Sequence, residues 1–109
     1  MNIETKNLFA GIPADLPQEL FTDLVSNNNV KIHRIVSKGH TSPDVGWYDQ
    51  EDHEWVIVLR GAAKIAFENG NVVDLKEGDY LNIPAHVKHK VSWTEPGNET
   101  IWLAVHYNC

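Results

Sequence analysis

The chain has 109 residues, of which 42% are hydrophobic and 22% charged, and its formal net charge at pH 7 is −6. This length and composition predict one domain with a hydrophobic core of its own. The negative charge and the lack of a basic cluster argue against nucleic acid and anionic membranes as partners. No stretch has the roughly 18 apolar residues of a membrane span, and the start of the chain does not resemble a signal peptide. The single cysteine, Cys109, is the last residue and is expected to have no role, so we expect a cytoplasmic protein.

Residues 1–29 are expected to form an arm and a short helix that pack on the rest of the chain. Gly11 and Pro13 punctuate residues 1–15, which predicts an extended arm. Residues 17–25 are predicted to be helical, because proline suits a first helical turn and apolar side chains recur at helical spacing. These apolar residues are Leu20, Phe21, Leu24 and Val25.

From Val30 onward the hydrophobic pattern changes to a period of two, which is the period of a β-strand. Residues 55–59 form a continuous apolar run, typical of a strand that is buried on both faces. Residues 62–67 and 71–75 flank Asn69-Gly70, a strong hairpin signal. Further strands are expected at residues 80–83, 88–93 and 99–107. Short strands at regular spacing predict an all-β antiparallel sandwich or barrel over residues 30–109.

Two short motifs coincide with these predicted strands. In the first, Glu54 is followed by six residues and then Gly61; in the second, Gly78 is followed by five residues, Pro84 and, further on, His89. The order and spacing of the motifs resemble those of the cupin superfamily, and most of all its small single-domain bacterial members. The resemblance covers most of the chain. It implies a double-stranded β-helix, or jelly-roll barrel, with a site in the barrel mouth.

The resemblance also implies a metal site. In the family, the glutamate of the first motif and the histidine of the second bind a metal ion, and these are Glu54 and His89 here. The first motif usually opens with a pair of histidines. Counting back from the glutamate, their places hold Tyr48 and Gln50 at the shorter spacing, or Trp47 and Asp49 at the longer one. Glutamine replaces histidine in some cupins.

Strand alternation gives an independent reason to single out Glu54. It shares its side of the strand with Val56 and Val58, which places a carboxylate inside an apolar barrel. Such burial is costly unless a metal or hydrogen-bond donors hold the group. Two interpretations remain, a metal ligand together with His89 or a hydrogen-bonded carboxylate–histidine pair. On an unbroken strand Gln50 would point to the same side as Glu54, and it is the expected third ligand.

Two further residues are candidates for catalysis. Tyr48 is expected on the same side of the strand as Glu54, where it could bind the metal or donate a hydrogen bond to a substrate. His53 should point the other way on a regular strand. A bulge would turn His53 inward, where it would serve as a reserve ligand or transfer protons, and a bulge near Asp52 would turn Asp49 inward. We expect His86 at the rim of the barrel. His106 on the last strand would either line the barrel cavity or lie in the core with its hydrogen bonds satisfied. Trp47 and Trp93 would either form a wall of the pocket or only contribute to packing.

The function that these residues favour is binding or transformation of a small oxygenated metabolite, with a divalent iron, manganese, nickel or zinc ion. In an enzyme the metal would act as a Lewis acid or bind dioxygen, and oxygenase, isomerase and lyase reactions all occur in the family. The alternatives are a non-catalytic ligand-binding or sensor module and a metal-free scaffold. We expect a homodimer, because small jelly rolls expose sheet edges and the arm, residues 1–12, could add a strand to a partner. Its apolar residues are Ile3, Leu8 and Phe9.

Overall fold

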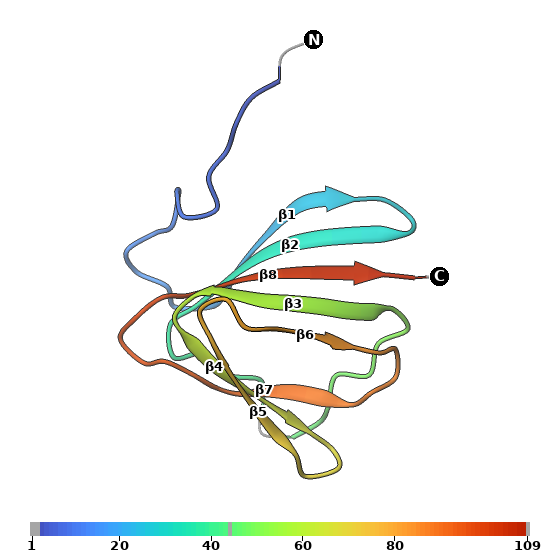
Figure 1. Ribbon diagram of the computed structural model, residues 1–109. Coiled ribbons are helices and arrows are strands. Elements are labelled where there is room, and N and C mark those ends of the chain that lie inside the picture. Colours follow the sequence, from blue (N-terminus) through green and yellow to red (C-terminus); the bar gives the residue numbers. More distant parts are fainter. Residues whose placement is uncertain (1–2, 44, 109) are drawn as a thin grey trace.

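The computed structural model describes residues 3–43 and 45–108 and contains two antiparallel β-sheets (Figure 1). Met1, Asn2, Asp44 and Cys109 lie outside the described residues. The larger sheet has the strand order β1 (Leu20–Ser26), β2 (Val30–Ser37), β8 (Thr100–Tyr107), β3 (His53–Arg60) and β6 (Tyr80–Ile83). The smaller sheet has the order β5 (Val72–Lys76), β4 (Ala62–Phe67) and β7 (His89–Thr94). The described residues form no helix that is long and apolar enough to cross a membrane.

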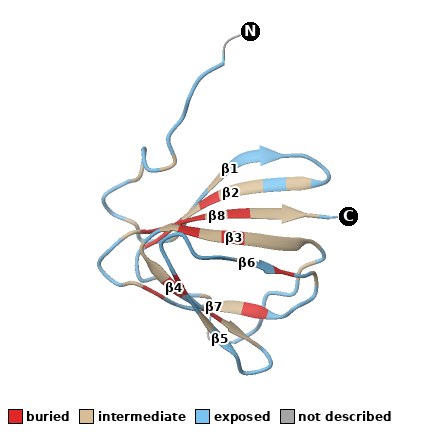
Figure 2. Ribbon diagram, viewed as in Figure 1, coloured by how far each residue is buried: buried red, intermediate tan, exposed pale blue. Residues whose placement is uncertain are grey.

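The all-β jelly-roll prediction is confirmed, and the core lies where the two sheets face each other. Alternate residues of β3 and β8 are buried there, including Val56, Val58 and Trp102. Ala63 and Ile65 of β4 meet them from the smaller sheet. Figure 2 shows buried segments on β2, β3 and β8 of the larger sheet and on β4 of the smaller one. Alternation along each strand therefore gives the sandwich one apolar inner layer.

The prediction of a helix over residues 17–25 is wrong, because residues 20–25 belong to β1. It pairs antiparallel with β2, and the register shifts between Asp23 and Val25, so Leu24 is the extra residue of a β-bulge. The bulge breaks the two-residue period and leaves an apolar spacing that imitates a helix. Three of the four apolar side chains are exposed, Phe21 by 61%, Leu24 by 41% and Val25 by 48%, so they do not form the buried face that a docked helix needs.

Gly61 makes the tight turn that leads from β3 in one sheet to β4 in the other. Its φ is +88°, and a Cβ atom there would lie 2.5 Å from Oγ1 of Thr100 and 2.8 Å from the carbonyl oxygen of Glu99. Only glycine fits this conformation and this close approach. The glycine of the first motif is therefore needed to hold the crossing between the sheets against the start of β8.

Candidate functional site

A pocket of about 240 Å³ lies between the two sheets. Its walls are mainly apolar, with Phe21, Ile35, Val56 and Trp102 among the lining side chains. The polar side chains that reach it are Glu19, Ser42, Tyr48, Gln50, Glu54, His89 and His106. An apolar hollow with a few convergent polar groups is the usual form of a site for a small organic ligand.

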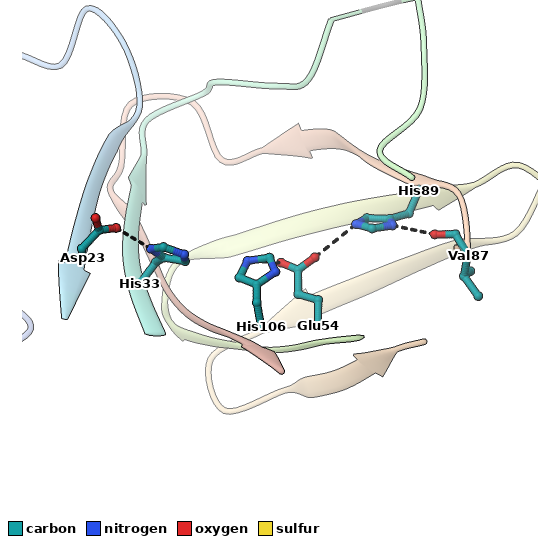
Figure 3. A network of polar contacts seen from close by, with 6 residues as sticks. All are labelled: Asp23, His33, Glu54, Val87, His89 and His106. Atoms are coloured by element: carbon teal, nitrogen blue, oxygen red, sulfur yellow. Dashed lines mark hydrogen bonds and ion pairs between the residues drawn. The ribbon is translucent and has the colours of Figure 1, made fainter. Parts of the chain in front are cut away.

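Glu54 lies at the centre of the polar groups, between two imidazoles (Figure 3). It comes from β3, where it pairs directly with His106 of β8, and it faces His89, the first residue of β7 in the other sheet. Its Oε1 atom is 3.2 Å from Nε2 of His89, and its Oε2 atom is 3.9 Å from Nε2 of His106. The side chains of Glu54 and His89 are only 13% and 6% exposed. The fold thus brings together two motif residues that are far apart in the sequence.

His89 is bonded at both ring nitrogens. Its Nδ1 atom lies 2.9 Å from the carbonyl oxygen of Val87, to which it donates a hydrogen bond, while Nε2 faces Glu54. Burial lowers the pKa of His89, but the hydrogen bonds to Glu54 and Val87 and the charge of Glu54 outweigh it, so the pKa is raised above 6.5. Between a carbonyl and a carboxylate, the imidazolium ion can donate at both nitrogens.

His106 shows the opposite electrostatic behaviour beside the same carboxylate. Burial lowers its pKa below 6.5, and this effect outweighs the charge of Glu54, which raises it. The neighbouring charges of His33 and Lys31 lower it further. The ring centroids of His33 and His106 are 5.3 Å apart, and His33 in turn bonds to Asp23 (Figure 3). At neutral pH the pocket therefore presents a neutral imidazole on this side.

The segment before β3 is tied to the loop that precedes β7. The N–H of Tyr48 donates to the carbonyl oxygen of His89 at 2.8 Å, and the N–H of His86 donates to the carbonyl oxygen of Gln50 at 2.8 Å. His86 has a φ of +63°, the only positive value among the described non-glycine residues. These bonds place the side chain of Gln50 on the pocket wall, where its Oε1 atom is buried without a hydrogen-bond partner among the described residues. Tyr48 lies at the rim and is 45% exposed.

The remaining candidates lie outside the pocket lining. His53 accepts a hydrogen bond from the N–H of Ala85 at 2.9 Å, and its ring packs 5.1 Å from that of Tyr107, so it points away from Glu54 as on a regular strand. His86 pairs with Asp49 at 2.8 Å on the surface, so both lie outside the lining. Trp47 and Trp93 do not wall the pocket between the sheets. Instead, the ammonium groups of Lys90 and Lys64 lie over their rings.

His106 is the functional candidate that the sequence ranked too low. Its position directly opposite Glu54 depends on the pairing register of β3 with β8, residues about fifty positions apart, which no local pattern reveals. The period-two alternation of residues 99–107 indicated only that His106 shares a side with Trp102 and Ala104. The signal available in the sequence was that both of these neighbours are apolar, and the structure shows that both are buried.

Two curved sheets closing over a glutamate and a histidine at these motif positions define a cupin barrel. A model of the cupin domain matches residues 33–106, and the chain therefore belongs to the cupin family. A crystal structure of a candidate mannose-6-phosphate isomerase from Ralstonia eutropha JMP134 superposes with a TM-score of 0.92 at 42% identity, over 98% of this chain and 100% of that one. No curated protein matches the chain.

More distant structures share the fold alone. A cupin superfamily protein from Desulfitobacterium hafniense DCB-2 has a TM-score of 0.75 at 23% identity, with 90% of this chain and 84% of that chain covered. The polyketide cyclase RemF from Streptomyces resistomycificus has a TM-score of 0.70 at 16% identity, with 84% and 66% covered. Proteins of different activity thus share this barrel, so the function must be argued from the site.

Cupins commonly bind metals, so the donor atoms of the pocket bear on this question. No group of three or more histidine, cysteine, aspartate or glutamate side chains forms a ready-made metal site in the described part of the chain. Glu54 and His89 therefore need a donor of another type, and the unpaired Oε1 atom of Gln50 is such an atom. The carbonyl of Val87 holds a proton on Nδ1 of His89, which leaves Nε2 as the donor nitrogen, the usual arrangement behind a metal-bound histidine. By donor type, these residues fit a divalent metal ion.

Proposed function

We propose that this cupin binds a small metabolite in the pocket between its sheets, with a divalent metal ion held by Gln50, Glu54 and His89. The observation that carries the proposal is the buried, unpaired Oε1 atom of Gln50 on the wall that Glu54 and His89 also line. A buried polar atom without a partner costs about 1–3 kcal/mol, and a bound cation or ligand donor would offset this cost. Nitrogen and oxygen donors of this kind suit iron, manganese, nickel or zinc.

The side chains around this group would have distinct roles. A bound metal would supply a Lewis acid that polarises an oxygen atom of the ligand. Tyr48, half exposed and part of the pocket lining, would donate a hydrogen bond to the ligand, and the apolar walls would exclude water from it. His53 supports the loop at Ala85 from outside the pocket, so Tyr48 is the better candidate for ligand contact.

We infer that the ligand carries hydroxyl or carbonyl oxygens and no phosphate group. The name of the Ralstonia eutropha relative suggests a phosphorylated sugar. However, the described residues that line this pocket include no lysine or arginine, and they include two carboxylates, Glu19 and Glu54. A phosphate group needs cationic or N–H donors to replace its water, and apart from the proposed metal ion and the imidazoles of His89 and His106 the described lining has no cationic side chain to supply them. Calorimetry with mannose and mannose 6-phosphate tests this inference. Tenfold tighter binding of the phosphorylated sugar would contradict it.

Metal titration of the metal-stripped protein by calorimetry tests the metal site itself. We expect one Mn²⁺ or Zn²⁺ ion per chain, with an affinity that falls by roughly tenfold or more in Glu54→Gln and also falls in Gln50→Ala. The matched control is Asp49→Asn, which alters a nearby carboxylate outside the pocket lining and should leave the affinity unchanged. Equal affinities of the wild type and Glu54→Gln would place the metal elsewhere.

A second candidate is a metal-free ligand-binding or sensor module, or a scaffold without a metal. It is favoured by the Glu54 carboxylate, which already has an imidazole near each oxygen and so can be held without a metal. In this case the carboxylate and imidazoles would bond directly to an organic ligand. The same titration separates the candidates, because this one predicts that neither Glu54→Gln nor Gln50→Ala changes metal binding.

A further inference from the structure

A groove of about 490 Å³ lies between the N-terminal arm and strands β1 and β2, and it contains a buried cation. Arg34 of β2 is one of its lining residues and is only 8% exposed. Arg34 pairs with Thr22 of β1 and alternates with Ile35, which lines the pocket between the sheets. The groove therefore lies on the other face of the larger sheet from that pocket.

The guanidinium group of Arg34 forms no ion pair with a carboxylate of the described residues. Asp23, the neighbour of Thr22 on β1, bonds instead to His33. A buried charge is costly unless hydrogen bonds or a group of opposite charge compensate it. The compensation that the chain itself provides for Arg34 can be followed donor by donor.

Three of the five N–H donors of Arg34 are used within the chain. Nη1 donates to the carbonyl oxygens of Leu8 at 3.1 Å and of Ala10 at 2.6 Å, and Nη2 donates to Oγ1 of Thr22 at 3.2 Å. Nε is buried without a hydrogen-bond partner among the described residues. The N–H of Nε and one N–H of Nη2 therefore remain, and such paired donors are the means by which arginine binds carboxylate and phosphate groups.

The other polar groups of the groove also favour an anion. The ammonium group of Lys6 and the hydroxyl groups of Thr5 and Thr22 line it. No aspartate or glutamate is among the described lining residues, although the chain has 15 acidic residues and only 9 basic ones. Two cations without a carboxylate make this groove locally positive on an acidic protein, and the field of such a groove attracts anions.

We propose that this groove is a binding site for a small oxyanion, the phosphate or carboxylate group of a small metabolite, held by Arg34, Thr22 and Lys6. The anion compensates the buried guanidinium group and accepts hydrogen bonds from its remaining donors. It also joins the arm to the sheet, because Lys6 belongs to the arm and Arg34 to β2. The site shares no lining residue with the pocket between the sheets, so it does not depend on what that pocket binds.

Calorimetry of the metal-stripped protein with inorganic phosphate and with acetate, at low ionic strength, tests this site. We expect saturable binding of one anion per chain, and the tighter probe identifies the oxyanion. The affinity should fall by roughly tenfold or more in Arg34→Gln and also fall in Lys6→Gln, because each change removes a charged donor. The matched control is Lys76→Gln, an exposed lysine of β5 in the other sheet, which should leave the affinity unchanged.

Circular dichroism shows whether Arg34→Gln folds, since this residue is buried. If it does not fold, Lys6→Gln and Thr22→Val decide, because both leave the guanidinium group and its bonds to Leu8 and Ala10 in place. The absence of saturable binding of either anion to the wild type would overturn the proposal. Equal affinities of the wild type and of the variants that fold would also overturn it, and Arg34 would then serve only to hold the arm.

Discussion

At the scale of the residue, the site depends on one carboxylate that meets two histidines of different character. Glu54 contacts His89 across the sandwich and His106 on the neighbouring strand. The pKa of His89 is raised, because its hydrogen bonds and the charge of Glu54 outweigh burial, and that of His106 is lowered by its burial. One imidazole is thus biased toward the charged form and the other toward the neutral form, at opposite sides of the same group.

Titration of the metal-free protein by nuclear magnetic resonance should resolve this difference. We expect His89 to titrate above pH 6.5 and His106 below it. A raised folded-state pKa stabilises the protein below pH 6.5, and this contribution is lost as the pH rises through the folded-state value. In Glu54→Gln the pKa of His89 should fall, and with it the extra stability at low pH. The reverse order of the two titrations would contradict this assignment of charge.

Sequence reasoning identified Glu54 and His89 because motif spacing and strand parity are local properties. Parity alone also predicted that His53 faces away from the site. His106 was ranked low because its contact with Glu54 depends on a long-range register. The sequence also could not predict that Oε1 of Gln50 is unpaired, because this depends on hydrogen bonds that hold residues 48–50 against the loop before β7.

At the scale of the element, turns and alternation were predictable and irregular strands were not. The hairpin at Asn69-Gly70 forms between β4 and β5, as its sequence indicated. The bulge in β1 conceals that strand, because one extra residue shifts every following side chain to the other face. Edge strands with bulges are therefore the elements that hydrophobic periodicity misassigns.

Two glycine substitutions test how the crossing between the sheets is held. Gly61→Ala should destabilise the fold by about 2 kcal/mol or more, because it adds a steric clash with Thr100 and Glu99 to a positive φ. Gly70→Ala is the matched control, because its φ is +95° but nothing lies within 4 Å of a Cβ atom there. It should cost about 1 kcal/mol. Urea denaturation measures the free energy of unfolding of both variants. Equal losses would show that the close approach of residue 61 to Thr100 and Glu99 does not contribute to stability.

At the scale of the whole molecule, the larger sheet has two different faces. Its inner face lines the pocket, and alternate residues of β3 point to the inner and the outer face. Glu54 and Val56 line the pocket, whereas Trp55 and Ile57 belong to the outer face.

This arrangement predicts that changes on the outer face leave metal binding unaffected. Tyr80→Glu should bind metal with the stoichiometry and affinity of the wild type, because Tyr80 is not among the pocket-lining residues. In contrast, Glu54→Gln should weaken metal binding. Calorimetry on both variants provides the measurement. A loss of metal affinity in Tyr80→Glu would show that the two faces are coupled.

The proposed function depends above all on whether Gln50, Glu54 and His89 hold one cation inside the pocket. Anomalous scattering of Mn²⁺, in crystals of the protein grown with that ion, locates the cation without reference to activity. We predict a single strong peak in the pocket, within bonding distance of the Gln50 amide oxygen, the Glu54 carboxylate and Nε2 of His89. A fully loaded crystal with no anomalous peak beside these three side chains would contradict the proposed site.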